Sequence, residues 1–250
     1  MDPIGIVAVV FLFVAFLTIL ATLKERKTDE YNAQRAQAYR DAAHSLQMEY
    51  AERGEGRVST QPEQAGLFNF GVQKQVRNVM RGTVKGLEIT IFDYEFSTFS
   101  NKSKQTARTT VVHMRQDGVT LPRFDIHPMK RAPRPVDEAQ LKELDFPDTA
   151  RFDATFLVRA GDKFGVRKLL TPVVRDFLED QRNWNIESLD SGLWLYRLGQ
   201  EVASNNLPQH VMDAHRIWDA LNGSVPAAYL NKPAASPETP PPPALPGPAN

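Results

Sequence analysis

The chain has 250 residues, with 30 basic and 30 acidic side chains that cancel at neutral pH. A neutral chain has no broad basic field, so no nucleic-acid partner is expected. The chain contains no cysteine, which excludes thiol nucleophiles, iron–sulfur clusters and cysteine-based zinc sites.

Near the N-terminus, residues 4–23 form an uninterrupted run of uncharged, mostly apolar side chains. In a helix that rises about 1.5 Å per residue, this run is long enough to cross a bilayer core of roughly 30 Å. Only Met1, Asp2 and Pro3 precede it, so the basic n-region of a cleaved signal peptide is missing. We therefore predict an uncleaved anchor; a cleaved signal peptide and a buried soluble helix are the alternatives.

A basic flank predicts the orientation of this anchor. Lys24, Arg26 and Lys27 follow the apolar run, and no lysine or arginine precedes it. The positive-inside rule then places the N-terminus outside and the rest of the chain in the cytoplasm, at the plasma (inner) membrane. We expect these three side chains to contact the membrane surface, which makes the lipid bilayer the first predicted partner.

Residues 1–27 are thus the predicted anchor with its basic flank, and residues 28–70 a stalk helix and linker. Apolar residues at helical spacing predict a helix over residues 28–53, ended by Gly54. This helix is either a stalk that packs weakly on the domain or a coiled coil that forms a homo-oligomer. Leu67, Phe68 and Phe70, near the end of the linker, are expected to insert into the core.

From Val72 onward the apolar period changes to two. The pattern predicts strands over residues 76–84, 87–96, 106–115 and 119–127, arranged as an antiparallel meander. Asp117-Gly118 predicts a hairpin between the last two strands. Pro122 favours an edge or bulge position for the last strand.

The remaining segments predict further strands and several helices. We expect a short helix at 137–144, a strand at 152–159 and a helix at 163–181 that breaks near Pro172. A hairpin over 184–198 and a helix over 207–222 follow. Strands followed by helices are typical of an α+β fold, here an antiparallel sheet with helices on one face. We expect this cytoplasmic α+β domain over residues 71–223 and a proline-rich, disordered tail over residues 224–250.

Acidic and histidine side chains on the predicted strands are candidates for acid–base catalysis. Asp125 and His127 alternate along one strand and therefore share a face. Asp93, on a neighbouring strand, could complete an acid–histidine cluster, with His113 as a fourth candidate. The other interpretation is that these residues occupy an exposed sheet face and have no chemical role.

Neither a metal site nor a cofactor is predicted. His210 and His215 are five residues apart, so they lie off a common helix face. The chain also lacks the glycine-rich motifs that bind nucleotide phosphates.

The polar stretch 97–108 contains Lys102, Lys104 and Arg108 and no acidic residue. Beside a membrane, these cations are expected to contact anionic headgroups. The alternative is a solvated hairpin tip.

Five segments carry a family resemblance: NVMRGTVKGLEITIFDYEFST, TTVVHMR, LPRFDIHP, FLVRAGD and LWLYRL, spread over residues 71–199. They resemble a group of uncharacterised bacterial proteins that have one N-terminal membrane helix and a soluble domain of unknown function. The resemblance implies a bacterial inner-membrane protein. It implies no activity and no site residues.

The leading functional hypothesis is a non-enzymatic, single-pass membrane protein whose cytoplasmic domain is a binding or scaffolding module. Its ligand would be a protein partner or the membrane surface. One alternative is an enzyme that acts on a membrane-associated substrate through Asp93, Asp125 and His127. The other is a structural oligomer assembled through the stalk helix.

Overall fold

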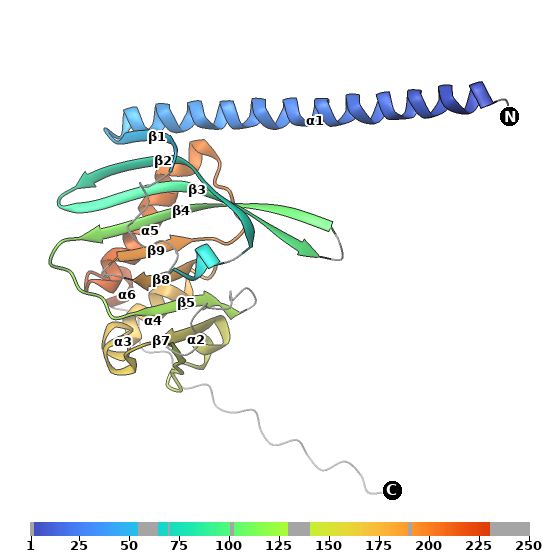
Figure 1. Cartoon of the computed structure of the whole chain (residues 1–250). Helices are drawn as coiled ribbons and strands as arrows, with labels where there is room; N and C mark the ends of the chain where they lie inside the picture. The colour runs from blue at the N-terminus through green and yellow to red at the C-terminus, as the bar shows by residue number, and fades with distance from the viewer. Residues whose placement is uncertain are drawn as a thin grey trace, which may run out of the picture.

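The computed structural model describes residues 3–54, 65–69, 71–100, 103–129, 141–189 and 192–230 (Figure 1). These residues form a nine-stranded sheet in which every recorded strand pair is antiparallel, together with several helices. The predicted α+β class is therefore confirmed. The proline-rich segment 231–250 lies outside the described residues.

One continuous helix, α1 (Pro3–Ser45), joins the predicted anchor to the predicted stalk. Its 43 residues give a length of about 65 Å. Most side chains of the apolar run 4–23 lie outside the described set. Among the residues that the structure describes, no helical stretch has both the length and the apolar character that a membrane crossing needs. The anchor therefore stays a prediction.

The predicted stalk helix ends earlier than expected, because residues Glu49–Arg53 form strand β1. Gln47 has a φ of 54°, outside the helical region, where the chain leaves α1. Tyr50 and Ala51 then pair with Met80 and Val79 of the neighbouring strand β2. Pairing with β2, which is distant in sequence, therefore outweighs the helical spacing of residues 49–53.

The strand order across the sheet is β1-β2-β3-β4-β9-β8-β5-β7-β6. Beyond β1, the strands are β2 (Val72–Val84), β3 (Leu87–Ser100), β4 (Ser103–Gln116), β5 (Phe124–Pro128), β6 (Lys142–Glu143), β7 (Phe156–Ala160), β8 (Asn185–Leu189) and β9 (Gly192–Tyr196).

The predicted meander is correct up to β4 and wrong beyond it. Asp117-Gly118 does form a turn, but β9 rather than β5 pairs with β4. Strand β5 lies inside the sheet, between β8 and β7, and starts after Pro122. The turn motif describes only local geometry, whereas the neighbour of β4 is decided by a strand about 80 residues later in the chain.

The helices and short 3-10 turns fill the connections between strands. They are η2 (Gly66–Asn69), α2 (Ala150–Thr155), α3 (Lys163–Leu169), α4 (Pro172–Glu179), η4 (Ser204–Asn206), α5 (Leu207–Leu221) and α6 (Ala227–Leu230). The expected break at Pro172 is confirmed, with Thr171 as the N-cap of α4. The strand predicted over 152–159 is helical in its first half. The first half of the helix predicted over 137–144 lies outside the described residues, and in the second half Lys142–Glu143 is a strand.

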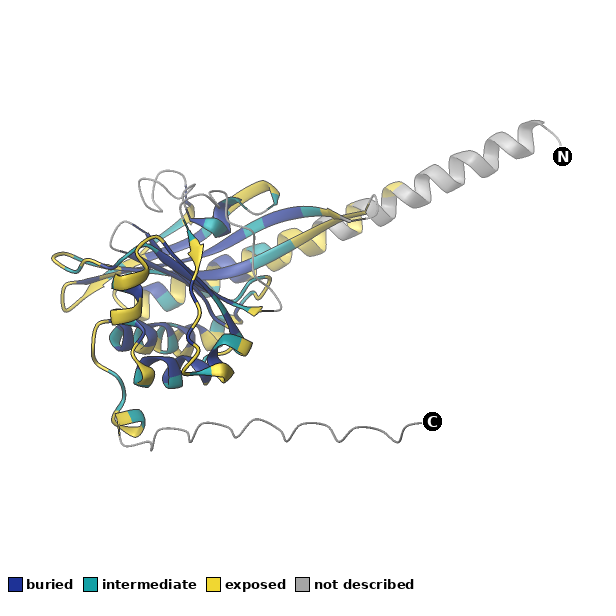
Figure 2. Cartoon of the chain, turned by 90° about the horizontal axis from the view of Figure 1, so that it is seen from below, coloured by how far each residue is buried: buried dark blue, intermediate teal, exposed yellow. Residues whose placement is uncertain are grey.

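The two faces of the sheet are covered differently. The helical face, which includes Ile91, Val112 and Leu195, packs against α1 and the helices of the C-terminal half. The aromatic face, which includes Phe92 and Trp194, packs against the segment Ala65–Asn69. Figure 2 shows the buried residues along the strands and on the sides of the helices that face them.

The folded region reaches beyond the predicted domain end at Gly223. Tyr229 of α6 donates a hydrogen bond to Asp180 at 2.7 Å. Its ring also packs edge-on against Phe177 of α4, with the ring centroids 5.3 Å apart. The first residues of the predicted tail thus dock on the domain.

Candidate functional site

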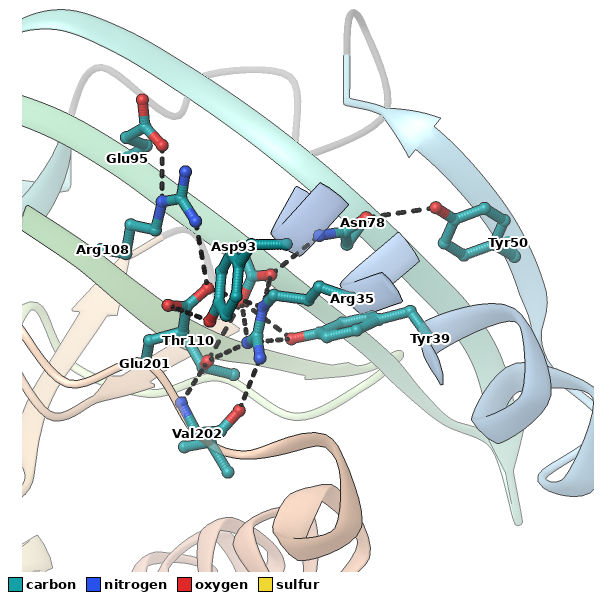
Figure 3. A network of polar contacts seen from close by, with 11 residues as sticks. Arg35, Tyr39, Tyr50, Asn78, Asp93, Glu95, Arg108, Thr110, Glu201 and Val202 are labelled. Carbon is teal, nitrogen blue, oxygen red and sulfur yellow. Dashed lines mark hydrogen bonds and ion pairs between the residues drawn. The ribbon is translucent and has the colours of Figure 1, made fainter. Parts of the chain in front are cut away.

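A buried network on the helical face joins α1 to the sheet (Figure 3). Arg35 donates from Nε to Asp93 Oδ2 at 2.7 Å and from Nη2 to Oδ1 at 2.8 Å. The Tyr39 hydroxyl donates to Asp93 Oδ1 at 2.8 Å. Arg35 and Tyr39 are four residues apart on α1, so both reach the same strand.

A bulge in β2 supplies another donor to this network. The register between β2 and β3 shifts between Arg77 and Met80, and Asn78 in the shift has a φ of 53°. Its Nδ2 donates to Asp93 Oδ2 at 2.9 Å, and its Oδ1 accepts from Tyr50 at 3.1 Å. Such bulges re-aim a side chain, here an amide toward a buried carboxylate.

The charges of this network are fixed by their surroundings. Burial lowers the pKa of Arg35, but the hydrogen bonds and charge of Asp93 outweigh burial, so the net pKa is raised. Burial and the negative charge of Asp93 raise the pKa of Tyr39 well above its usual value. With Thr110 also donating to Asp93 at 3.1 Å, the carboxylate is saturated with donors. Every recorded contact of this carboxylate is to a residue of the fold, so we interpret the network as a structural joint.

A second polar network lies on the aromatic face. Arg159 of β7 donates to both oxygens of Asp125, at 2.8 and 2.9 Å. His127 Nε2 lies 3.6 Å from Asp125 Oδ2, and His127 Nδ1 lies 3.0 Å from Asn185 Oδ1. Asp125 and His127 share a face as predicted, and both are buried, with 5% and 1% exposure.

Glu187 of β8, which the sequence reasoning did not select, lies opposite Asp125 in the register. Its carboxylate accepts hydrogen bonds from the Tyr196 hydroxyl and from the backbone N–H of Gly66, the latter at 2.5 Å. Burial raises the pKa of Glu187. In the sequence, Glu187 could have been recognised as an acidic residue within a predicted strand, next to the apolar Ile186.

The protonation behaviour of Asp125 and His127 follows from their contact. Burial raises the pKa of Asp125, but hydrogen bonds and charges from His127 and Arg159 outweigh it, so the net pKa is lowered. Burial lowers the pKa of His127, but the interaction with Asp125 outweighs it, so the net pKa is raised. The pair therefore favours an ionised, internally compensated state.

The predicted acid–histidine cluster does not assemble. Asp93 points to the helical face, and three strands (β4, β9 and β8) separate it from Asp125 and His127. His113 lies on the aromatic face but two strands away from Asp125, with its ring 4.1 Å from the ring of Trp194. The prediction failed because β5 was assigned beside β4.

Three of the six predicted membrane-contact residues line a groove of about 1190 Å³. One wall is α1, with Leu23, Lys27 and Tyr31, and the other is the β3–β4 hairpin, with Lys104 and Arg108. Lys102 and the side chain of Lys24 lie outside the described residues, and Arg26 is exposed on α1 but does not line the groove.

Ion pairs organise the inner end of this groove. Arg108 donates to Glu95 at 2.6 Å and lies 3.8 Å from Glu201. Tyr31 donates to Glu201 at 2.7 Å, and the Arg108 guanidinium lies 5.4 Å from the Tyr31 ring centre. The charge of Arg108 is therefore compensated locally, while Lys27 and Lys104 are exposed.

Among the described residues, no group of three or more histidine or acidic side chains is placed to hold a metal ion.

Comparison with known proteins shows similarity in fold only. No protein-family model matches the chain, and no curated protein matches it. The fold is similar to the crystal structure of the mycobacterial trehalose monomycolate transport factor A, TtfA, with a TM-score of 0.55 and 12% sequence identity. The match covers 76% of this chain and 96% of TtfA.

Proposed function

We propose that this protein is a membrane-anchored cytoplasmic binding module, in which α1 is both the anchor and one wall of the binding groove. The observation that carries the proposal is the Arg35–Asp93 joint, which fixes α1 on the sheet. Lys27, Tyr31 and Arg35 follow each other at intervals of four residues, so the groove wall and the joint share one side of the helix.

The joint makes the groove a preformed feature. Separating this buried, bidentate pair would leave the Asp93 carboxylate without its cation in a poorly solvated interior, whereas Arg35 keeps a second acidic partner, Glu201, 2.7 Å from its Nε. The part of α1 near the groove is therefore held at a fixed distance from the hairpin. A binding site assembled from two distant segments needs this kind of rigid support.

The fold neighbour supports an accessory role in transport, because TtfA is a trehalose monomycolate transport factor. Together with the predicted anchor, this leads us to propose that the present chain is an accessory protein that handles a lipid or a membrane-protein partner.

A photo-crosslinking experiment tests this proposal. A photoreactive amino acid at Thr106, which lines the groove, should capture a membrane lipid or membrane protein in cells. The matched control is the same amino acid at Lys142, exposed on the far edge strand β6. The full chain should also stay in the membrane pellet after an alkaline wash. Equal capture from both positions, or a chain found in the soluble fraction, would overturn the proposal.

The enzyme alternative now rests on Asp125, His127 and Glu187 alone. Their proximity is the observation in its favour, but all three are buried beneath Ala65–Asn69 or their neighbouring strands. A substrate could reach them only if this segment moved. A coiled coil of stalk helices would need the apolar side chains of α1 at the interface between copies. Tyr39 and Ala43 instead pack on the domain of their own chain, which argues against the oligomer alternative.

A further inference from the structure

We propose that the groove between α1 and the β3–β4 hairpin binds the phosphate-bearing headgroup of an anionic phospholipid from the bilayer around α1. This inference deepens the proposed function and rests on it. It names the ligand class of the groove and the two residues that select it, Lys27 and Lys104.

Two lysines place positive charge at the rim of the groove. Lys27 comes from α1 and Lys104 from β4, so two cations from distant segments border one opening. Both are exposed, and within the described part of the chain neither forms an ion pair. Arg108, by contrast, is held by Glu95 and Glu201. The two lysines therefore leave an excess positive charge that an anionic headgroup would match.

The groove begins where the apolar run of α1 ends. Leu23, the last residue of the apolar run 4–23, borders the groove, and Lys27 follows one helical turn later. When the apolar run crosses the bilayer, this turn lies at the level of the lipid phosphates. The groove thus opens where headgroups are concentrated, and a soluble anion would have no such advantage.

The β3–β4 hairpin carries an exposed aromatic ring near its end. Phe99 is 66% exposed and pairs with Lys104 in the β3–β4 register. The hairpin projects from the sheet in the same direction as the N-terminal half of α1 (Figures 1 and 2). An exposed aromatic ring beside a lysine is the combination that anchors proteins at a membrane interface. The tip would enter the interface while the groove behind it holds a headgroup.

The test uses the full chain in a mild non-ionic detergent and counts bound lipids by native mass spectrometry. The probes are dioctanoyl phosphatidylglycerol, which is anionic, and dioctanoyl phosphatidylcholine, which has no net charge. We expect a clear preference for phosphatidylglycerol. The double variant K27Q/K104Q should bind it roughly thirtyfold more weakly, the effect expected for two lysines near a headgroup.

The control is the double variant K142Q/K163Q, which removes the same charge from exposed residues on β6 and α3. It should bind like the parent chain. Equal binding by the two double variants would overturn the proposal. Displacement of the lipid by millimolar inorganic phosphate would also overturn it, because the groove would then be a general anion site.

Failure of this inference can be separated from failure of the proposed function. The K27Q/K104Q variant keeps the apolar run and should remain in the membrane fraction. Loss of lipid selectivity with retained membrane association is the expected result. Equal lipid binding by both double variants, with the chain still membrane-bound, rejects the groove alone. A parent chain in the soluble fraction rejects the proposed function.

Discussion

Arg35 and Asp93 form a bidentate ion pair that helps to connect the longest helix to the sheet, and both residues are buried, with 6% and 4% exposure. Ion pairs of this kind contribute little net stability compared with an apolar replacement of both partners. Removing one partner is different, because the other charge stays buried without compensation. The sequence could not identify this pair, since its members are 58 residues apart and Arg35 appears on a polar helix surface.

The Asp93→Ala variant tests the joint. We expect it to lower the free energy of unfolding by roughly 3–5 kcal/mol, measured by chemical denaturation of the full chain in detergent. The control Arg40→Ala removes an exposed cation 3.5 Å from Glu52 and should cost less than about 1 kcal/mol. The double variant Arg35→Ala/Asp93→Ala should cost less than the two single changes added together. Similar costs for Asp93→Ala and Arg40→Ala would contradict the structural joint.

His210 gives a prediction about acid stability. Burial lowers its pKa to about 4, with a further contribution from the charge of Arg197, and its ring stacks on Trp184 at 4.5 Å. A histidine with a lowered pKa stabilises the fold above its unfolded pKa near 6.5, and this contribution is lost as pH falls toward 4. His210→Phe keeps an aromatic ring on Trp184 and removes the titration.

We therefore expect the His210→Phe variant to lose less stability than the parent chain between pH 6.5 and pH 4, by roughly 2 kcal/mol. Denaturation curves collected across this range measure the difference. Parallel pH profiles for the two proteins would show that His210 does not titrate in this way.

At the scale of elements, the short segment Ala65–Asn69 covers the aromatic face of the sheet. Phe68 makes edge-on contacts with Tyr94 and Trp194, at centroid distances of 4.9 and 5.3 Å. A Cβ on Gly66 would lie 3.2 Å from Glu187 Oε2, so the close approach of the backbone to this carboxylate favours glycine. The predicted insertion into the core is confirmed for Leu67 and Phe68, whereas Phe70 lies outside the described residues.

Phe68→Ala should lower the free energy of unfolding by about 3 kcal/mol, because it empties a buried aromatic site. It should also shift the fluorescence of Trp194 to longer wavelength as water reaches the ring. Phe164→Ala, at a ring that is 68% exposed, is the matched control and should change stability by less than about 0.5 kcal/mol. If both variants unfold alike, Ala65–Asn69 does not cover the sheet as described.

Elements defined by local chemistry could be predicted, and elements defined by distant partners could not. The break at Pro172 and the extent of α5 follow from proline geometry and helical spacing. The insertion of β9 and β8 between β4 and β5 depends on pairing between distant segments, which leaves no local pattern. The same holds for the candidate site. The shared face of Asp125 and His127 could be predicted because both lie on one strand. The approach of Glu187 and Arg159 could not be predicted, because they lie on the neighbouring strands.

At the scale of the whole molecule, the natural absence of cysteine makes the predicted orientation directly testable. We expect an Asp2→Cys variant to react with a membrane-impermeant maleimide in intact cells. A Glu49→Cys variant, exposed on β1, should react only after lysis. This result follows from the basic flank that begins at Lys24. The reverse labelling pattern would place the domain outside the cytoplasm and contradict the positive-inside assignment.

The continuity of α1 also has a mechanical consequence. If the apolar run crosses a bilayer as we propose, the helix of about 65 Å, fixed to the sheet near Arg35, would act as a lever arm that pivots at the bilayer surface. Transmembrane helices adjust their tilt to the local hydrocarbon thickness. With the apolar run in the bilayer, a thicker or thinner membrane would change the tilt of α1, and the Arg35–Asp93 joint would turn that change into a rotation of the entire sheet relative to the membrane plane.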